Sequence, residues 1–179
     1  MHYPLDEYLI LDEMRSEFRL QYVEGDVLAM SGSSLDKSHI TNNLLRLLRA
    51  LPPEYRFYFS RLRLATPSGL YSYPDFMVVR DPIEMVPDIR DTVTNPVLLI
   101  EIPSEWTDEF DRGKKFEHYS TIPALRDVIF IDQYKIGVEH RWRDGDLWRT
   151  NRFGKGERLV LVPITVSVDA LYEDVTIPA

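Results

Sequence analysis

Two carboxylates and one lysine stand where they could form a cation site. Asp75 opens the apolar segment 75–80, and Glu101 interrupts the apolar run 97–102 near its end. Two carboxylates at corresponding places on neighbouring strands can converge on one hard cation such as Mg²⁺, which takes carboxylate oxygens and keeps several waters. Lys115, on the helix expected next, could bring an ammonium group to the same point. Phosphodiester hydrolysis needs such a set, because the metal activates water while the lysine orients that water or stabilises the developing anion.

The placement of Glu101 also has simpler explanations. A buried carboxylate without a partner costs several kcal/mol or becomes protonated, so a glutamate in an apolar strand needs a cation nearby. Glu101 could instead lie at the hydrated end of its strand or pair with an arginine. Paired carboxylates also serve glycoside hydrolysis, but that reaction requires a sugar-sized groove and a raised pKa, and the sequence indicates neither.

The distribution of charge changes what the net charge implies. The chain has 179 residues and a formal net charge of −8, which by itself argues against a nucleic-acid partner. Positions 81–111 contain nine acids and one base, so this segment carries the whole excess and the rest of the chain is neutral. Positions 36–63, by contrast, contain six bases and two acids. The acidic segment is either a solvated loop or the edge of a carboxylate-rich cation site.

Length and composition limit the class of protein. A chain of 179 residues can bury one hydrophobic core, so we expect a single domain over residues 1–179. The absence of cysteine excludes a disulfide scaffold, a Cys-ligated metal and a thiol nucleophile. No apolar stretch approaches the roughly 20 residues of a membrane span, and the first residues lack the pattern of a signal peptide. We therefore expect a cytoplasmic protein with no membrane partner.

Hydrophobic periodicity predicts an α/β protein with a mixed sheet. Apolar residues at helical spacing favour a helix that Pro52 and Pro53 end, and Asp144-Gly145 is typical of a hairpin turn. Helices are expected at 5–17, 36–50, 108–120 and 169–172, and strands at 18–24, 27–30, 56–59, 62–66, 75–80, 97–102, 128–132, 137–143, 147–151 and 159–162. The order of helix, β-rich middle, helix and further strands indicates the α/β class.

Aromatic and arginine side chains gather around the expected hairpin at Asp144-Gly145. They are Tyr134, Trp142, Trp148 and Phe153, with Arg141, Arg143, Arg149 and Arg152. Rings of this kind can stack on bases while arginines contact phosphates, which would make the hairpin a DNA or dimer surface. The structural alternative is a cross-strand aromatic pair with charged outer positions.

Five segments resemble the Uma-two family of restriction-endonuclease-like proteins, which is common in cyanobacteria. They are residues 16–32, YPDFMVV at 73–79, PVLLIEI at 96–102, DRGKKFEHY at 111–119, and 123–132. Their order and spacing match the family over nearly the whole chain. The resemblance implies one domain with the PD-(D/E)xK nuclease fold, in which helices flank a central mixed β-sheet, here with an added β-hairpin region.

The resemblance also implies roles for individual residues. Asp75 corresponds to the motif aspartate and Glu101 to the motif glutamate, and both would bind Mg²⁺ or Mn²⁺. Pro103 stands where the motif lysine usually lies, and Lys115 is its implied replacement. Gln21 stands where the family commonly has a glutamate, so it would contribute at most an accessory polar contact.

Two further departures leave two functions open. Lys37 stands where a histidine is common, and residues 104–107 read SEWT in place of the family's Ser-Pro-Ser-Thr run. The first hypothesis is a metal-dependent endonuclease that hydrolyses phosphodiester bonds in nucleic acid, with DNA as the expected substrate and a homodimer as the expected assembly. The second is a nuclease-fold protein with weak or no catalysis that acts as a binding or regulatory domain.

Overall fold

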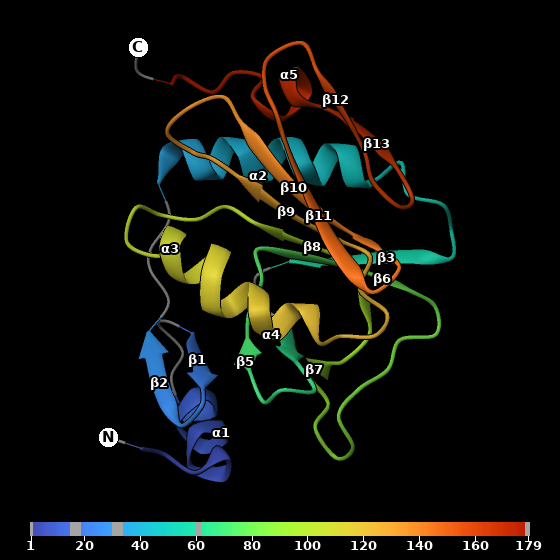
Figure 1. Ribbon diagram of the computed structural model, residues 1–179. Helices are drawn as coiled ribbons and strands as arrows, with labels where there is room; N and C mark the ends of the chain where they lie inside the picture. The colour runs from blue at the N-terminus through green and yellow to red at the C-terminus, as the bar shows by residue number, and fades with distance from the viewer. Residues whose placement is uncertain (1, 15–18, 30–33, 60–61, 178–179) are drawn as a thin grey trace.

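The computed structural model describes residues 2–14, 19–29, 34–59 and 62–177, which form an α/β fold with mixed sheets flanked by helices (Figure 1). The helices are α1 (Leu5–Met14), α2 (Leu35–Leu48), α3 (Asp108–Phe110), the π-helical turn η1 (Asp111–Lys115), α4 (Phe116–Ser120) and α5 (Val168–Leu171). The strands are β1 (Leu20–Val23), β2 (Asp26–Ala29), β3 (Tyr55–Phe59), β4 (Arg63–Ala65), β5 (Tyr71–Ser72), β6 (Phe76–Arg80), β7 (Thr92–Val93), β8 (Pro96–Glu101), β9 (Asp127–Ile131), β10 (Val138–Asp144), β11 (Leu147–Phe153), β12 (Arg158–Val160) and β13 (Thr165–Ser167). The α/β class expected from the sequence is therefore confirmed.

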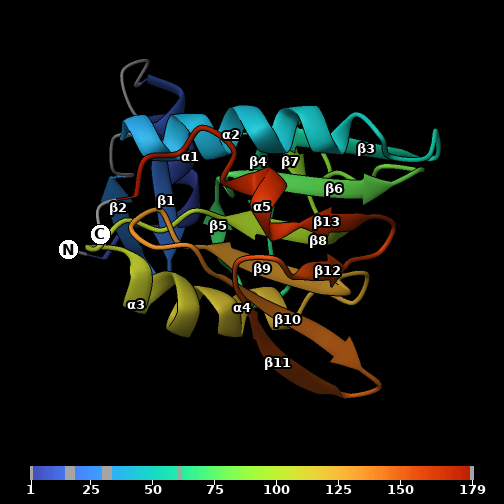
Figure 2. The same ribbon diagram turned by 90° about the horizontal axis from the view of Figure 1, so that it is seen from above.

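A six-stranded sheet with the order β11-β10-β9-β8-β6-β3 forms the centre of the fold. Strands β8 and β9 pair in parallel, and the other neighbours pair antiparallel, so the sheet is mixed as expected. Helix α2 lies along one face, and the helical segment from α3 to α4 lies along the other (Figure 1). Figure 2 shows the β10–β11 hairpin extending beyond these helices, which matches the added hairpin region.

Alternating side chains of the central strands supply two hydrophobic clusters, one on each face of the sheet. Phe76 and Val78 of β6 pack with Ile40 and the other apolar residues of α2. Met77 of β6 packs on the opposite side with Tyr119 of α4. This alternation explains why β6, β8 and β9 read as continuous apolar runs, since a strand covered on both faces has no polar side.

A second sheet, with the order β2-β1-β5-β4-β7, lies beside the first and carries α1 against it (Figure 1). Arg63 on β4 connects this sheet to α1. It donates to the carboxylate of Asp12 at 3.0 Å and to the hydroxyl of Tyr73 at 3.0 Å. The Tyr73 hydroxyl also donates to Asp12. All three side chains are buried, so this charged network fixes α1 to the sheet.

The observed elements differ from the expected ones mainly where strands are very short. Strands β5, β7 and β13 contain two or three residues, too few to show a period in the sequence. The single helix expected at 108–120 contains a π-helical turn in its middle. The end expected for the first helix, at 15–17, lies outside the described residues, as do two residues, 60 and 61, of the basic segment.

Among the described residues, no helix combines the length and the apolar character needed to cross a membrane.

Candidate functional site

The two predicted carboxylates lie at adjoining ends of β6 and β8. These strands are antiparallel neighbours in which Phe76 pairs with Ile100, so Asp75 and Glu101 extend the ladder by one position. The backbone N–H of Ile102 donates to Oδ2 of Asp75 at 2.7 Å, which fixes the carboxylate against the end of β8. Strand pairing therefore brings together two acids separated by a long stretch of sequence.

Glu101 interacts with two donors from the helical segment that runs from α3 to α4. Its Oε1 lies 2.9 Å from Nζ of Lys115 and accepts a hydrogen bond of 2.6 Å from the hydroxyl of Tyr119. Nζ of Lys115 also lies 3.1 Å from Oδ1 of Asp111. Asp111, Lys115 and Tyr119 follow one another at intervals of four residues, so they share one face of the helix.

The π-helical turn η1 ends at the lysine of this group. A π-turn inserts one residue into a helix and rotates the side chains that follow it, and such turns often occur at functional sites. Here Lys115 and Tyr119 both point at Glu101, and Lys115 is only 3% exposed. The predicted convergence of Lys115 on Glu101 is thus present, while the chemical role of the pair stays a prediction.

Burial dominates the electrostatics of the site. It raises the pKa of Glu101 to about 7, and the positive charge of Lys115 opposes this rise while Asp111 and Asp75 add to it. Burial alone would lower the pKa of Lys115, but Glu101, Tyr119 and Asp111 together outweigh this effect, so that this pKa lies well above its ordinary value. The lysine therefore stays charged, while burial favours the protonated form of Glu101 more than in an exposed glutamate.

Asp75 has a cation of its own, Lys37 from the first turn of α2. Nζ of Lys37 lies 2.7 Å from Oδ1 and 2.9 Å from Oδ2 of Asp75, and it donates to the backbone carbonyl of Ile102 at 3.0 Å. Ser34 caps α2 by accepting from the backbone N–H of Lys37 at 3.0 Å, which fixes the start of the helix beside the strand ends.

Three residues of the site were not assigned a role from the sequence. Lys37 stood out only as a departure from the family's histidine, and nothing in its spacing connects it to Asp75. Asp111 and Tyr119 carried a usable signal, because each lies four residues from Lys115 on the expected helix. A search for polar residues on the face that carries Lys115 would have found both.

Gln21 makes none of these contacts. It is buried on β1 of the second sheet, and its Oε1 has no hydrogen-bond partner within the described ranges. The residue retains hydrogen-bonding capacity that the structure leaves unused, which is unusual for a buried amide. Its accessory role stays a prediction.

The oxygen atoms around Asp75 fit a hard divalent cation. The structure contains, in the part of the chain that it describes, no group of three or more His, Asp or Glu side chains that could hold a metal ion. Mg²⁺, however, needs only one or two carboxylates and completes its shell with water. The ammonium of Lys37 already contacts both oxygens of Asp75 and the carbonyl of Ile102, so this donor set accepts positive charge. A metal would fit the same oxygens once Lys37 had left them.

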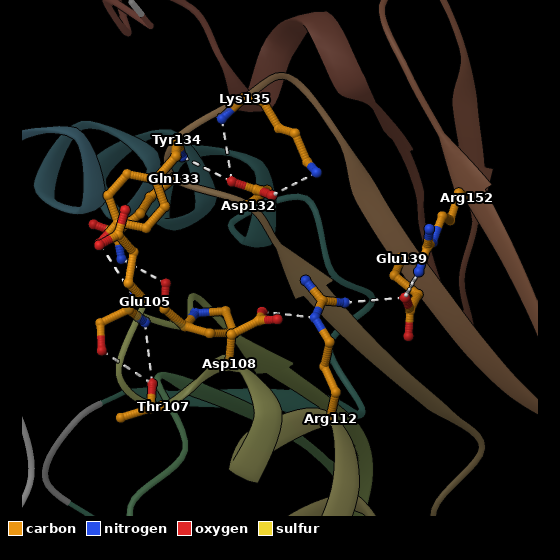
Figure 3. Close-up of polar contacts among 12 residues, drawn as sticks. Glu105, Thr107, Asp108, Arg112, Asp132, Gln133, Tyr134, Lys135, Glu139 and Arg152 are labelled. Carbon is orange, nitrogen blue, oxygen red and sulfur yellow. Dashed lines mark hydrogen bonds and ion pairs between the residues drawn. The ribbon is translucent and has the colours of Figure 1, made fainter.

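The arginines of the β10–β11 hairpin form contacts within the protein, although the side chains of Arg149 and Arg152 stay 56% and 83% exposed. The buried Glu139 meets Arg112 at 3.1 Å and Arg152 at 3.1 Å, and Arg112 reaches back to Asp108 at 2.7 Å (Figure 3). Arg141 also contacts Glu139, at 2.7 Å. Of these guanidinium groups only that of Arg112 comes from the helix, so its ion pair with Glu139 links the hairpin to the helix, while Arg141 and Arg152 lie on the hairpin itself.

The prediction that aromatic residues pair across the strands of this hairpin is wrong for its two tryptophans. Trp142 pairs with Arg149, and Trp148 pairs with Arg143, so the two tryptophans belong to opposite faces of the hairpin. Trp148 packs edge-on against Phe116 of α4, with ring centroids 5.2 Å apart. This contact makes Trp148 part of the packing between hairpin and helix.

A solved structure shares the fold of this chain. The chain superposes with a TM-score of 0.74 on a structure from Anabaena variabilis that is described as "a putative nuclease belonging to DUF820". The match covers 94% of this chain and 96% of that one at 20% sequence identity. At this identity the likeness establishes a shared fold alone, an α/β arrangement of mixed sheets flanked by helices.

The family follows from the sequence itself. Residues 5–170 match the Uma2 family, described as "Putative restriction endonuclease", and the chain belongs to that family. "Uncharacterized protein sll1609" of Synechocystis sp. is 34% identical over 143 residues, which cover 78% of this chain and 80% of that protein. "Uncharacterized protein slr1290" of the same organism is 30% identical over 177 residues, which cover 93% and 90%. The family resemblance found in the motifs is therefore confirmed.

Proposed function

We propose that this protein is a metal-dependent endonuclease that hydrolyses phosphodiester bonds in nucleic acid, with DNA as its expected substrate. The observation that carries the proposal is the meeting of Asp75, Glu101 and Lys115 at one end of the central sheet. Membership of a family described as putative restriction endonucleases supports the same reaction class. A homodimer is a common arrangement for nucleases that cut both strands of a duplex, so we propose a homodimer, and we propose the cytoplasm as its location.

The carboxylates would bind the cofactor, which we propose to be Mg²⁺ or Mn²⁺. Asp75 would supply carboxylate oxygens, Glu101 lies beside it, and the carbonyl of Ile102 completes the protein's share of the ligands. A divalent ion held there would lower the pKa of a water molecule and neutralise charge on the scissile phosphate. Water would fill the remaining positions, as it commonly does around Mg²⁺.

The remaining side chains position the carboxylate and supply positive charge. Tyr119 donates to Glu101 at 2.6 Å and restricts its rotation. Lys115 remains protonated because Glu101 and Asp111 surround it, so its ammonium can orient a water molecule or stabilise charge that develops on the phosphate. The helix from α3 to α4 thus supplies what a motif lysine two residues after the glutamate supplies in other members of the class.

A metal-titrated nuclease assay tests the proposal. Purified protein would be incubated with single- and double-stranded DNA and RNA over a range of Mg²⁺ and Mn²⁺ concentrations, and products resolved on denaturing gels. Asp75→Asn and Glu101→Gln keep the size of each side chain and should abolish cleavage. Glu105→Gln, which removes an exposed carboxylate from the same acidic segment, is the matched control and should cleave normally. Cleavage that persists in Asp75→Asn would show that another site, or a contaminant, is responsible.

A second candidate function is a nuclease-fold protein that binds a partner without cleaving it. The specific observation in its favour is the ammonium of Lys37 on the oxygens of Asp75, which must leave before a metal can bind. Failure of the wild-type protein to cleave any of the four substrates with either metal would favour this second function.

A further inference from the structure

We propose that Lys37 acts as a tethered cation that occupies the metal position and competes with divalent metal for Asp75. The proposal rests on the function proposed above and adds a control of metal binding to it. Lys37 belongs to α2, outside the strands and the helix that provide the other site residues. The side chain would therefore set how much metal the site requires.

The contacts of Lys37 are those of a bound ion. A lysine ammonium has three N–H donors and no acceptor. Nζ of Lys37 has three oxygen neighbours, at 2.7, 2.9 and 3.0 Å, namely the two carboxylate oxygens of Asp75 and the carbonyl of Ile102. Every donor thus has an oxygen partner of the kind that Mg²⁺ selects. An ammonium and a metal cannot share these oxygens at such distances, so one must displace the other.

The charge balance of the site favours retention of the lysine when metal is absent. Three acids, Asp75, Glu101 and Asp111, gather at this end of the sheet. Lys115 lies between Glu101 and Asp111, so among the residues that the structure describes Asp75 would have no cation of its own without Lys37. An uncompensated carboxylate in such a place is costly, and Lys37 removes that cost in the metal-free protein.

The lysine is placed so that it can leave. Its side chain is 20% exposed and that of Asp75 is 16% exposed, whereas Lys115 is 3% exposed. Lys37 lies in the first turn of α2, which Ser34 caps. Rotation of its flexible four-carbon stem therefore requires no change in the backbone. Of the two site lysines, Lys37 is the exchangeable cation and Lys115 the fixed one.

Metal binding measured without substrate tests this proposal. Mn²⁺ affinity would be determined by isothermal titration calorimetry and by the loss of the free-ion electron paramagnetic resonance signal, for wild type, Lys37→Met, Lys37→Arg and Lys37→Met/Asp75→Asn. Lys37→Met keeps the unbranched side chain up to Cε without the charged Nζ, and it should bind Mn²⁺ at least about tenfold more tightly than wild type, since a competing charge within 3 Å has gone. The Mn²⁺ affinity of Lys37→Arg should stay close to that of wild type, and the double variant should not show the increase in affinity.

Two controls make the result specific to this position. Lys135→Met removes an exposed lysine that lies 3.7 Å from Asp132 and should leave Mn²⁺ affinity unchanged. The thermal midpoint of Lys37→Met should fall below that of wild type without metal and recover when Mn²⁺ is added, because the metal then compensates Asp75. If Lys37→Met folds but its thermal midpoint does not recover when Mn²⁺ is added, the result also counts against the proposal.

The outcomes separate this proposal from the function on which it rests. If wild type binds Mn²⁺ through Asp75 and Lys37→Met binds no more tightly, the tethered cation is refuted and the endonuclease proposal stands. If Lys37→Met gains Mn²⁺ affinity but no variant cleaves nucleic acid, the tethered cation is supported and the endonuclease proposal fails. If no protein in the series binds Mn²⁺, both are overturned.

Discussion

Replacement of Lys115 by methionine would leave two buried carboxylates without their shared cation. Lys115 and Glu101 are each 3% exposed and Asp111 is 5% exposed, so bulk solvent would compensate little of the lost charge. Removal of one partner from a buried ion pair costs about 3–5 kcal/mol. In a domain of this size each kcal/mol lowers the melting temperature by about 2–4 °C. The expected decrease is therefore roughly 6–20 °C at a pH where Glu101 is ionised.

The assay is thermal and urea unfolding at pH 8 and at pH 5.5, followed by circular dichroism. At pH 5.5 the penalty should shrink, because the raised pKa of Glu101 lets this carboxyl bind a proton and become neutral. Lys115→Met/Glu101→Gln should recover much of the loss at pH 8, since neutral groups need no counterion. Lys135→Met, on the exposed surface, should change stability by less than about 0.5 kcal/mol.

Two results would refute this reasoning. A loss below about 1 kcal/mol for Lys115→Met at pH 8 would mean that the pair contributes no more than a surface salt bridge. A double variant no more stable than the single one would mean that the methionine disturbs packing and that the orphaned charge of Glu101 is unimportant.

Two further predictions concern pH and the second sheet. Because burial raises the pKa of Glu101 from 4.5 to about 7, the folded protein binds more protons than the unfolded chain between these values, so the free energy of unfolding should fall as pH rises from about 4.5 to 7. Glu101→Gln should flatten this slope when urea midpoints are measured against pH, and an unchanged slope would assign it to another group. Arg63→Met should cost about 3–5 kcal/mol in urea unfolding, because Asp12 would lose its buried cation. Arg63→Met/Asp12→Asn should restore part of that loss, and equal stability of the two variants would contradict this account.

Several elements of the fold were predictable because their signals are local. Ile40 and Leu44 fall at helical spacing and face the core on α2, and the apolar run that ends in Glu101 forms the buried strand β8. A hairpin turn at Asp144-Gly145 joins β10 and β11 as expected. The two-residue strands β5 and β7 were not predictable, since their strand conformation comes from neighbours rather than from any repeating pattern.

The candidate site shows the same division. Asp75, Glu101 and Lys115 could be selected from the sequence because an acid that interrupts or opens an apolar strand must find a cation. Only the tertiary structure shows which cation pairs with each acid. Lys115 reached Glu101 as expected, whereas Lys37, separated from Asp75 by a whole helix and several strands, was visible only as an unusual residue type.

The order of amino acids was enough to identify the family and the α/β class and to select the side chains proposed to carry the chemistry, because residue type and local periodicity are encoded in it directly. The tertiary structure alone decided how the charges are paired, because a salt bridge depends on distances between segments that the chain order does not specify. The local excess of acid between positions 81 and 111 illustrates the difference. Glu101 and Asp111 within it share Lys115 from the helix, and Asp75 outside it holds Lys37 from α2.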